Sequence, residues 1–153
     1  MQELKKRLAG LLVCMLLILM GCSDDAMTGG KPPKGMIVIG KETYETVLGA
    51  YCWKGMCTDT AGAVDLLKGK APIEVKPNQE VRFVIDYEPK PNEIHLMQTN
   101  EGKEKEVAVK ENRFVVPKEK GIYYYGYGAW WMDEEEEQLS HGDALYAFVL
   151  EVK

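Results

Sequence analysis

The sequence predicts an all-β fold, an antiparallel β-sandwich that occupies residues 36–153. From residue 36 onward, short runs rich in β-branched and aromatic residues follow one another, separated by turn-forming residues, and no long stretch has a helical period. Apolar and polar residues alternate within several runs, which is typical of strands with one buried face. Five prolines, from Pro72 to Pro117, fall at the ends of runs, where a missing backbone N–H does least harm.

Nine runs are predicted to be strands, and they share β-prone composition and flanking turn residues. In chain order they are MIVI (36–39), ETVLGAYCW (45–53), IEV (73–75), EVRFVIDY (80–87), EIHLMQT (93–99), KEVAVK (105–110), RFVV (113–116), GIYYYGYGAW (121–130) and ALYAFVLEV (144–152). A short helix is the alternative only over 58–70, where Val64 and Leu67 are spaced along one helical face and Gly69 can end it.

Alternation predicts which side chains of the strands face the core. In 80–87 the odd-numbered residues are apolar or aromatic, whereas Arg82 and Asp86 fall on the opposite face. In the last run the even-numbered residues from Tyr146 to Val152 are all apolar, so this strand has an apolar face in the core.

Two segments resemble immunoglobulin-like domains. IEVKPNQEVRFVIDY (73–87) is similar to the strand, proline-containing turn and strand of bacterial surface modules of this type. EKGIYYYGY (119–127) is similar to the entry into the penultimate strand, with Tyr123 at the position of the tyrosine corner. The resemblance implies an immunoglobulin-like β-sandwich, in which Tyr125 stands where the second sheet-bridging cysteine would be. It implies no particular function.

The N-terminus has the organisation of a secretory signal peptide. Residues 1–7 carry three basic side chains, and 8–20 form an uncharged apolar run. The run is shorter than the roughly 20 residues that span a bilayer, so a transmembrane helix is the weaker alternative. The sequence Leu19-Met20-Gly21-Cys22 resembles the lipobox of bacterial lipoproteins. This resemblance implies cleavage after Gly21 and lipidation of Cys22, and an ordinary secreted protein is the alternative.

The segment that follows the lipobox is predicted to be a flexible tether. Residues 22–35 are polar, rich in Gly and Pro, and have no apolar period. With the signal peptide over 1–21, the expected organisation is an anchor, a tether and one domain. We therefore expect a lipid-anchored protein on the extracytoplasmic face of a bacterial cell membrane, held to the membrane by its N-terminal lipid.

Charge argues against nucleic-acid partners. The formal net charge is −5, and removal of the basic signal peptide makes the remainder more acidic. An acidic domain gains no general attraction to phosphate backbones or anionic headgroups. An envelope protein or a glycan fits better as a partner, and we expect no cofactor.

The pair of cysteines in YCWKGMC (51–57) is predicted to form a disulfide. Cys14 lies in the signal peptide and Cys22 takes the lipid, which leaves Cys52 and Cys57 in an oxidising compartment. A redox dithiol is an alternative, although the spacing is not CxxC and a β-prone run precedes it. A zinc site is another alternative, but it requires further ligands.

Copper is the more specific metal hypothesis. His95 and Met97 share one strand face, and they form a soft ligand set together with His141, Met132 and Met56. The alternative is that this half-buried His–Met pair on a strand has a structural role, which is the more common case.

The segment 123–143 combines aromatic and acidic residues, and it is the candidate binding surface. Trp130 and Trp131 are followed by Asp133 and an unbroken run of glutamates over 134–137. One interpretation is an exposed aromatic platform that stacks on a sugar or docks a protein. The alternative is a core face of tyrosines followed by a solvated acidic loop.

Calcium binding and catalysis receive less support from this segment. Asp133, the glutamates and Asp143 supply oxygen ligands for Ca²⁺, but without the interleaved spacing of dedicated calcium loops. Ser140, His141 and Asp143 are residue types of a catalytic triad, yet neighbouring side chains of one loop do not form its relay easily. We therefore expect a binding protein and not an enzyme.

Overall fold

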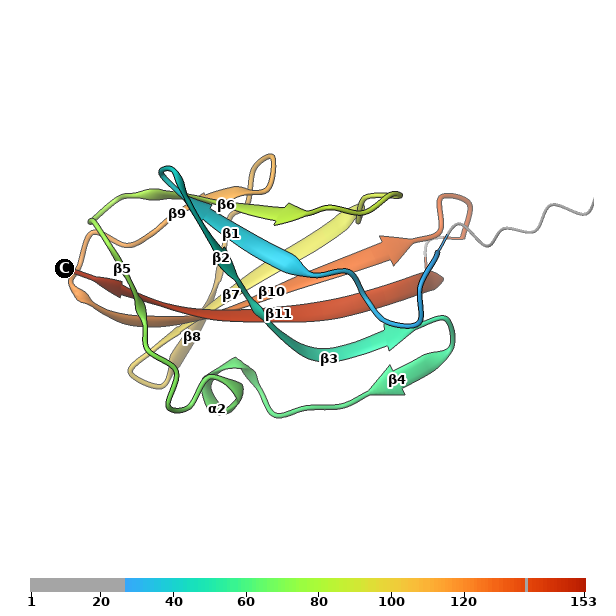
Figure 1. Ribbon diagram of the computed structural model, residues 1–153, viewed down its shortest axis with the longest axis horizontal. Helices are drawn as coiled ribbons and strands as arrows, with labels where there is room; N and C mark the ends of the chain where they lie inside the picture. The colour runs from blue at the N-terminus through green and yellow to red at the C-terminus, as the bar shows by residue number, and fades with distance from the viewer. Residues whose placement is uncertain (1–26, 137) are drawn as a thin grey trace, which may run out of the picture.

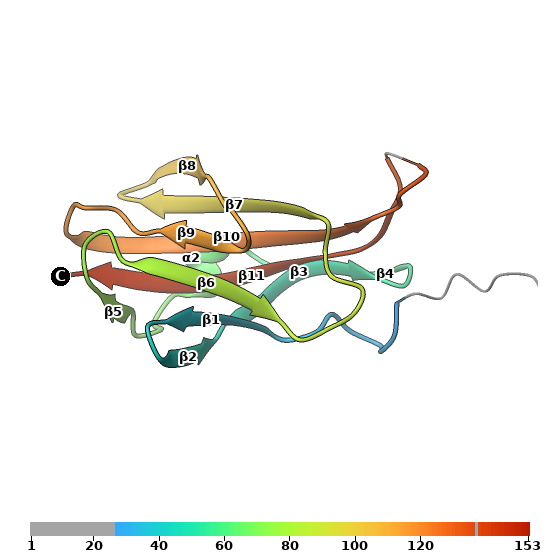
Figure 2. The same ribbon diagram turned by 90° about the horizontal axis from the view of Figure 1, so that it is seen from above.

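A computed structural model describes residues 27–136 and 138–153. The described chain is nearly all β and forms two packed sheets, which confirms the predicted β-sandwich (Figure 1). The predicted signal peptide, Cys14, the lipobox with Cys22, and Glu137 lie outside the described residues. In two perpendicular views, the described chain begins at the end of the sandwich opposite the C-terminus (Figures 1 and 2).

The smaller sheet has four antiparallel strands in the order β2-β1-β6-β9. They are β1 (Gly35–Ile39), β2 (Glu42–Glu45), β6 (Glu80–Ile85) and β9 (Arg113–Val115). In β6, Val81, Phe83 and Ile85 are buried and Arg82 is exposed, which confirms the alternation read from the sequence.

The larger sheet has seven strands, six of them in the order β4-β3-β11-β10-β7-β8. They are β3 (Val47–Trp53), β4 (Met56–Thr58), β7 (Glu93–Asn100), β8 (Lys103–Val107), β10 (Gly121–Met132) and β11 (Ser140–Val152). The seventh, β5 (Ile73–Val75), pairs with β11 in parallel, within a sandwich whose other strand pairs are antiparallel.

Several predicted elements differ in their bounds. The predicted strand 45–53 is interrupted at Thr46, whose side-chain hydroxyl and N–H both donate to the Gly35 carbonyl. The helical alternative over 58–70 contracts to α2 (Ala63–Leu66), and residue 58 belongs to β4. β10 and β11 extend beyond the predicted ends because the two strands pair over nearly their whole length.

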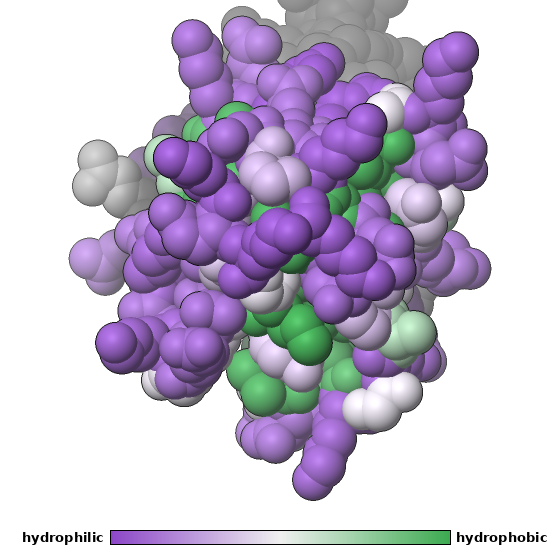
Figure 3. Space-filling view, turned by 90° about the vertical axis from the view of Figure 1, so that its left-hand side faces the viewer, coloured by the Kyte–Doolittle hydropathy of each residue, from purple (hydrophilic) through white to green (hydrophobic). Residues whose placement is uncertain are grey.

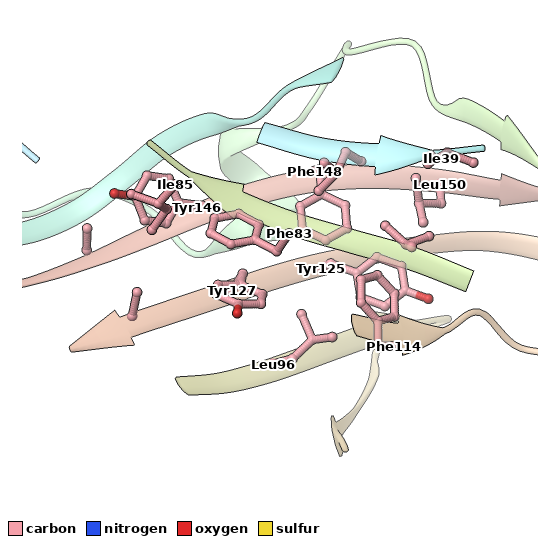
Figure 4. Packing of buried hydrophobic residues seen from close by; sticks show 14 of the residues in the cluster. Ile39, Phe83, Ile85, Leu96, Phe114, Tyr125, Tyr127, Tyr146, Phe148 and Leu150 are labelled. Carbon is pink, nitrogen blue, oxygen red and sulfur yellow. The ribbon is translucent and has the colours of Figure 1, made fainter. Parts of the chain in front are cut away.

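The core between the sheets is dominated by aromatic rings (Figure 4). Tyr125 and Tyr127 of β10 point inward, and Phe83 stacks on Tyr127 with the ring centroids 3.7 Å apart. The opposite face of β11 also buries Ala147 and Val149, because α2 packs over that part of the larger sheet. This second, smaller core explains why β11 is apolar on both faces.

The strand order agrees with the immunoglobulin-like expectation. β1, β6 and β9 correspond to strands A, B and E of that fold, and β7, β10 and β11 correspond to C, F and G. The tyrosine corner is present, since the Tyr123 hydroxyl donates to the Glu119 carbonyl at 2.9 Å. The fold is therefore an immunoglobulin-like β-sandwich in which the corner is kept and the sheet-bridging disulfide is replaced by aromatic packing around Tyr125.

The chain that leads into β1 packs against the sandwich, which differs from the predicted tether over 22–35. Met27 is 5% exposed, and Pro32 is buried. The Pro33 carbonyl accepts a hydrogen bond from the Tyr146 hydroxyl at 2.8 Å. Met27 and Pro32 therefore pack against the domain, whereas residues 28–31 between them are exposed.

Candidate functional site

The two cysteines form the predicted disulfide. Cys52 of β3 and Cys57 of β4 are directly paired across the hairpin, with their Cα atoms 4.0 Å apart. The connecting residues Lys54 and Gly55 have φ values of 52° and 77°, as a tight two-residue turn requires. Trp53, next to the disulfide, is 1% exposed and belongs to the core.

Trp131 is a core residue, so the prediction of a platform made by Trp130 and Trp131 is wrong for this side chain. It is 2% exposed, and its indole N–H donates to the Pro89 carbonyl at 2.7 Å. Its ring meets that of Trp53 edge to face, with centroids 4.9 Å apart. Successive residues of a strand point to opposite faces, so two adjacent tryptophans on β10 do not form one platform.

Trp130 lies on the outer face of the larger sheet and is half-buried. Its ring leans along β10 over Gly128, and a Cβ placed on Gly128 would lie 2.5 Å from two ring atoms. The His95 ring meets the indole edge to face at 5.4 Å. Glu93 and Asp143 are the register neighbours of Trp130 on the two adjacent strands, so carboxylates flank the indole on both sides.

His95 is held by carboxylates. Its Nδ1 is 2.8 Å from Glu106 Oε1, and its Nε2 is 3.0 Å from Glu93 Oε1. The hydrogen bonds to Glu106 and Glu93 raise the pKa of His95 above its ordinary value, because both partners stabilise the imidazolium form. Across the indole, burial raises the pKa of the Asp143 carboxyl, an effect partly offset by the Cys52 N–H.

A hollow of about 310 Å³ lies on the same sheet face, between α2 and the outer residues of β7 and β10. Met97, Gly126 and Leu145 line it on the sheet side, and Ala63 and Asp65 line it on the helix side. Met97 pairs with Gly126 and His95 pairs with Gly128, so the hollow and Trp130 are neighbours on one surface. We call this surface the Trp130 face; it comprises Glu93, His95, Met97, Gly126, Gly128, Trp130, Asp143 and Leu145.

The acidic segment after β10 is organised by its own hydrogen bonds. Asp133 Oδ1 accepts the N–H groups of Glu135 and Glu136, each at 2.8 Å, and Oδ2 is 2.8 Å from His141 Nε2. These bonds lower the pKa of the Asp133 carboxyl. The largest contribution comes from the Glu136 N–H, followed by the Glu135 N–H and His141. Asp133 lies in the β10–β11 hairpin and Asp143 lies on the Trp130 face. The carboxylates proposed as calcium ligands are therefore in two different parts of the surface.

The copper ligands of the sequence hypothesis are only partly brought together. His95 and Met97 share the Trp130 face, whereas His141 bonds to Asp133 at the β10–β11 hairpin. Met56 is 70% exposed at the tip of the β3–β4 hairpin. Among residues 27–136 and 138–153, no group of three or more His, Cys, Asp or Glu side chains is arranged to hold a metal ion.

The triad residue types do not form a relay. The Ser140 hydroxyl donates to the Gly142 carbonyl at 2.9 Å, and His141 is engaged by Asp133. Asp143 points to the opposite side of β11 from the core-facing Gly142. These three residues therefore lack the Ser to His to Asp contacts that nucleophilic catalysis requires.

Sequence reasoning missed Glu93, Gly128 and the contribution of Asp143 to the Trp130 face. The period of two in β10 places Gly126, Gly128 and Trp130 on one face, and this signal was available. The pairing of β10 with β7 and β11, which brings the carboxylates beside Trp130, is not encoded locally.

Comparison with protein-family models, curated proteins and solved structures finds no match for this chain. In the part of the chain that the structure describes, no helix has the length and apolar character needed to cross a membrane.

Proposed function

We propose that this protein is a lipoprotein anchored on the extracytoplasmic face of a bacterial cell membrane, where it has a non-catalytic binding or accessory role. The observation that carries the proposal is the sequence Leu19-Met20-Gly21-Cys22 at the end of a charged and then apolar leader. The Cys52–Cys57 disulfide supports it, because structural disulfides are typical of oxidising compartments.

Mass spectrometry of the mature protein from the native membrane tests the anchor. We expect an N-terminal Cys22 that carries a diacylglyceryl group, and incorporation of a labelled fatty acid. Cys22→Ser should abolish both and leave the protein unprocessed, whereas Cys14→Ser, the matched control, should be processed normally. An unmodified Cys22 in the membrane fraction would overturn the anchor.

The binding role is assigned to the Trp130 face. An indole flanked by Glu93 and Asp143 can stack on an apolar ligand surface while the carboxylates accept hydrogen bonds or attract cations. Gly128 carries no side chain, so the indole lies along the sheet over it, and Leu145 and Ala63 lie over Gly126. This combination suits an envelope protein or a glycan, and the negative charge of the face disfavours nucleic acid.

Crosslinking and capture of the intact lipoprotein from its native membrane tests the binding role. Trp130→Ala should remove specific partners that the wild type captures. Val115→Ala is the matched control, because Val115 is 53% exposed on β9 of the other sheet. An unchanged set of partners in Trp130→Ala would eliminate the Trp130 face as the binding surface.

A further inference from the structure

The described chain begins with a segment that is fastened to one end of the sandwich. Met27 is 5% exposed and lies near Gly142 of β11 and Trp53 of β3. The Tyr87 hydroxyl accepts the Thr28 N–H at 2.6 Å and donates to the Thr28 carbonyl at 3.2 Å. These contacts determine where on the domain the anchor must be attached.

The length of chain between this segment and Cys22 is short compared with the domain. Cys22 precedes Met27 by five residues, which span at most about 18 Å when fully extended. β11 runs nearly the length of the sandwich with 13 residues, or about 43 Å. The covalent link is therefore less than half as long as the domain.

We propose that the end of the domain near Met27 faces the lipid surface. This end, called the hairpin end, comprises the β3–β4 turn at 54–55, the loop at 88–91 and the described residues of the β10–β11 hairpin, 133–136 and 138–139. The inference rests on the proposed lipidation of Cys22. The link keeps the hairpin end within about 18 Å of the bilayer, whereas the opposite end can be about 40 Å farther away.

The hairpin end exposes two apolar side chains. Met56 is 70% exposed and Leu139 is 43% exposed, and both lie on hairpins of the hairpin end. Glu134, Glu135 and Glu136 belong to the same hairpin as Leu139 and repel anionic headgroups, so the lipid and the apolar tips, not charge, hold this end close. The opposite end, seen in Figure 3, is mostly hydrophilic but also shows apolar side chains, and Ile122 of that end is 43% exposed.

The orientation places the candidate binding surface close to the membrane. Trp130 is three residues before Asp133, where the β10–β11 hairpin begins. A partner of the Trp130 face would therefore be engaged near the membrane surface and not far out in the surrounding space.

Paramagnetic broadening of amide signals in the intact, isotope-labelled lipoprotein tests the orientation. The protein is placed in phosphatidylcholine nanodiscs that contain a gadolinium-chelating lipid. We expect strong broadening at Gly55 and Glu135 and little at Gly40 and Gly102, which lie in turns of the opposite end. Equal broadening at both ends, or stronger broadening at Gly40 and Gly102, would overturn the inference.

A variant with about twelve Gly and Ser residues inserted after Ser23 is the control for the length of the link. It keeps Cys22 and the packing of Met27, and it should reduce the difference between the two ends. The intact mass of each sample separates the two proposals. A lipidated protein without a difference between its ends contradicts only the orientation, whereas an unlipidated protein from native membranes contradicts the anchor itself.

Discussion

The indole of Trp130 occupies the space that a side chain on Gly128 would need. A Cβ at position 128 would lie 2.5 Å from two atoms of the ring, closer than real Cβ contacts allow. The two residues are adjacent on the same face of β10, so the glycine permits the indole to lie along the sheet and not project from it.

Gly128→Ala should therefore displace the Trp130 ring. Because the clashing atoms are the far end of a half-buried ring that can swing away, we expect a loss below about 1 kcal/mol in the free energy of unfolding, measured by urea denaturation. Partner capture should fall as it does for Trp130→Ala. Gly62→Ala is the control, because nothing lies within 4 Å of a Cβ at that position. Unchanged partner capture by Gly128→Ala would contradict the close packing of Trp130 on Gly128.

Replacement of each of the adjacent tryptophans should have opposite consequences. Trp131→Ala removes a buried ring and its hydrogen bond to Pro89, so we expect a loss of about 3–5 kcal/mol in the free energy of unfolding. Trp130→Ala should lower the free energy of unfolding less than Trp131→Ala does, and it should reduce partner capture more. If thermal and urea unfolding show Trp130→Ala to be the less stable variant, the assignment of the two faces is wrong.

The disulfide should contribute modestly to stability because it closes a short loop. Cys52 and Cys57 are five residues apart, and a chain-entropy model gives about 2 kcal/mol for such a loop. The double variant Cys52→Ala, Cys57→Ala should lose about this amount in urea denaturation. A thiol assay on the denatured, unreduced lipoprotein should detect no reactive cysteine, and two reactive thiols would contradict the disulfide.

His95 should make the stability of the protein depend on pH. Its pKa is raised in the folded state by Glu106 and Glu93, so its stabilising contribution is fully present below the unfolded pKa of about 6.5. The contribution is lost as the pH rises through the higher folded pKa. Titration of the His95 ring by NMR should give a pKa above 6.5, and Glu106→Gln should lower it. A ring that titrates at or below 6.5 in the wild type would contradict these contacts.

Much of the strand content could be predicted because β-sheet patterning is local. The alternation over 80–87 identified the buried face of β6, and Tyr123 was identified as the corner residue from its surroundings in the chain. The same alternation also separates Trp130 from Trp131, although an interpretation based on composition placed both on one surface.

Other features depend on contacts between distant segments. Residues 27–34 look like a tether in sequence because their composition is polar and rich in Gly and Pro. They are held by Tyr87 and Tyr146, which lie 59 and 113 residues farther along the chain from Thr28 and Pro33. No pattern among neighbouring residues of the sequence indicates that Tyr87 and Tyr146 are the partners of this segment.

The sequence by itself determined the β class, the inward face of the principal strands, the disulfide pairing and the signal that predicts an anchor. These follow from periodicity of two, from turn residues and from the number of cysteines, which are properties of neighbouring residues. Only the tertiary structure decided that Trp131 is core, that Glu93 and Asp143 flank Trp130, and that Met27 is fastened at the hairpin end. These depend on which strands pair and in which register, and that choice is made by the packing of the whole core.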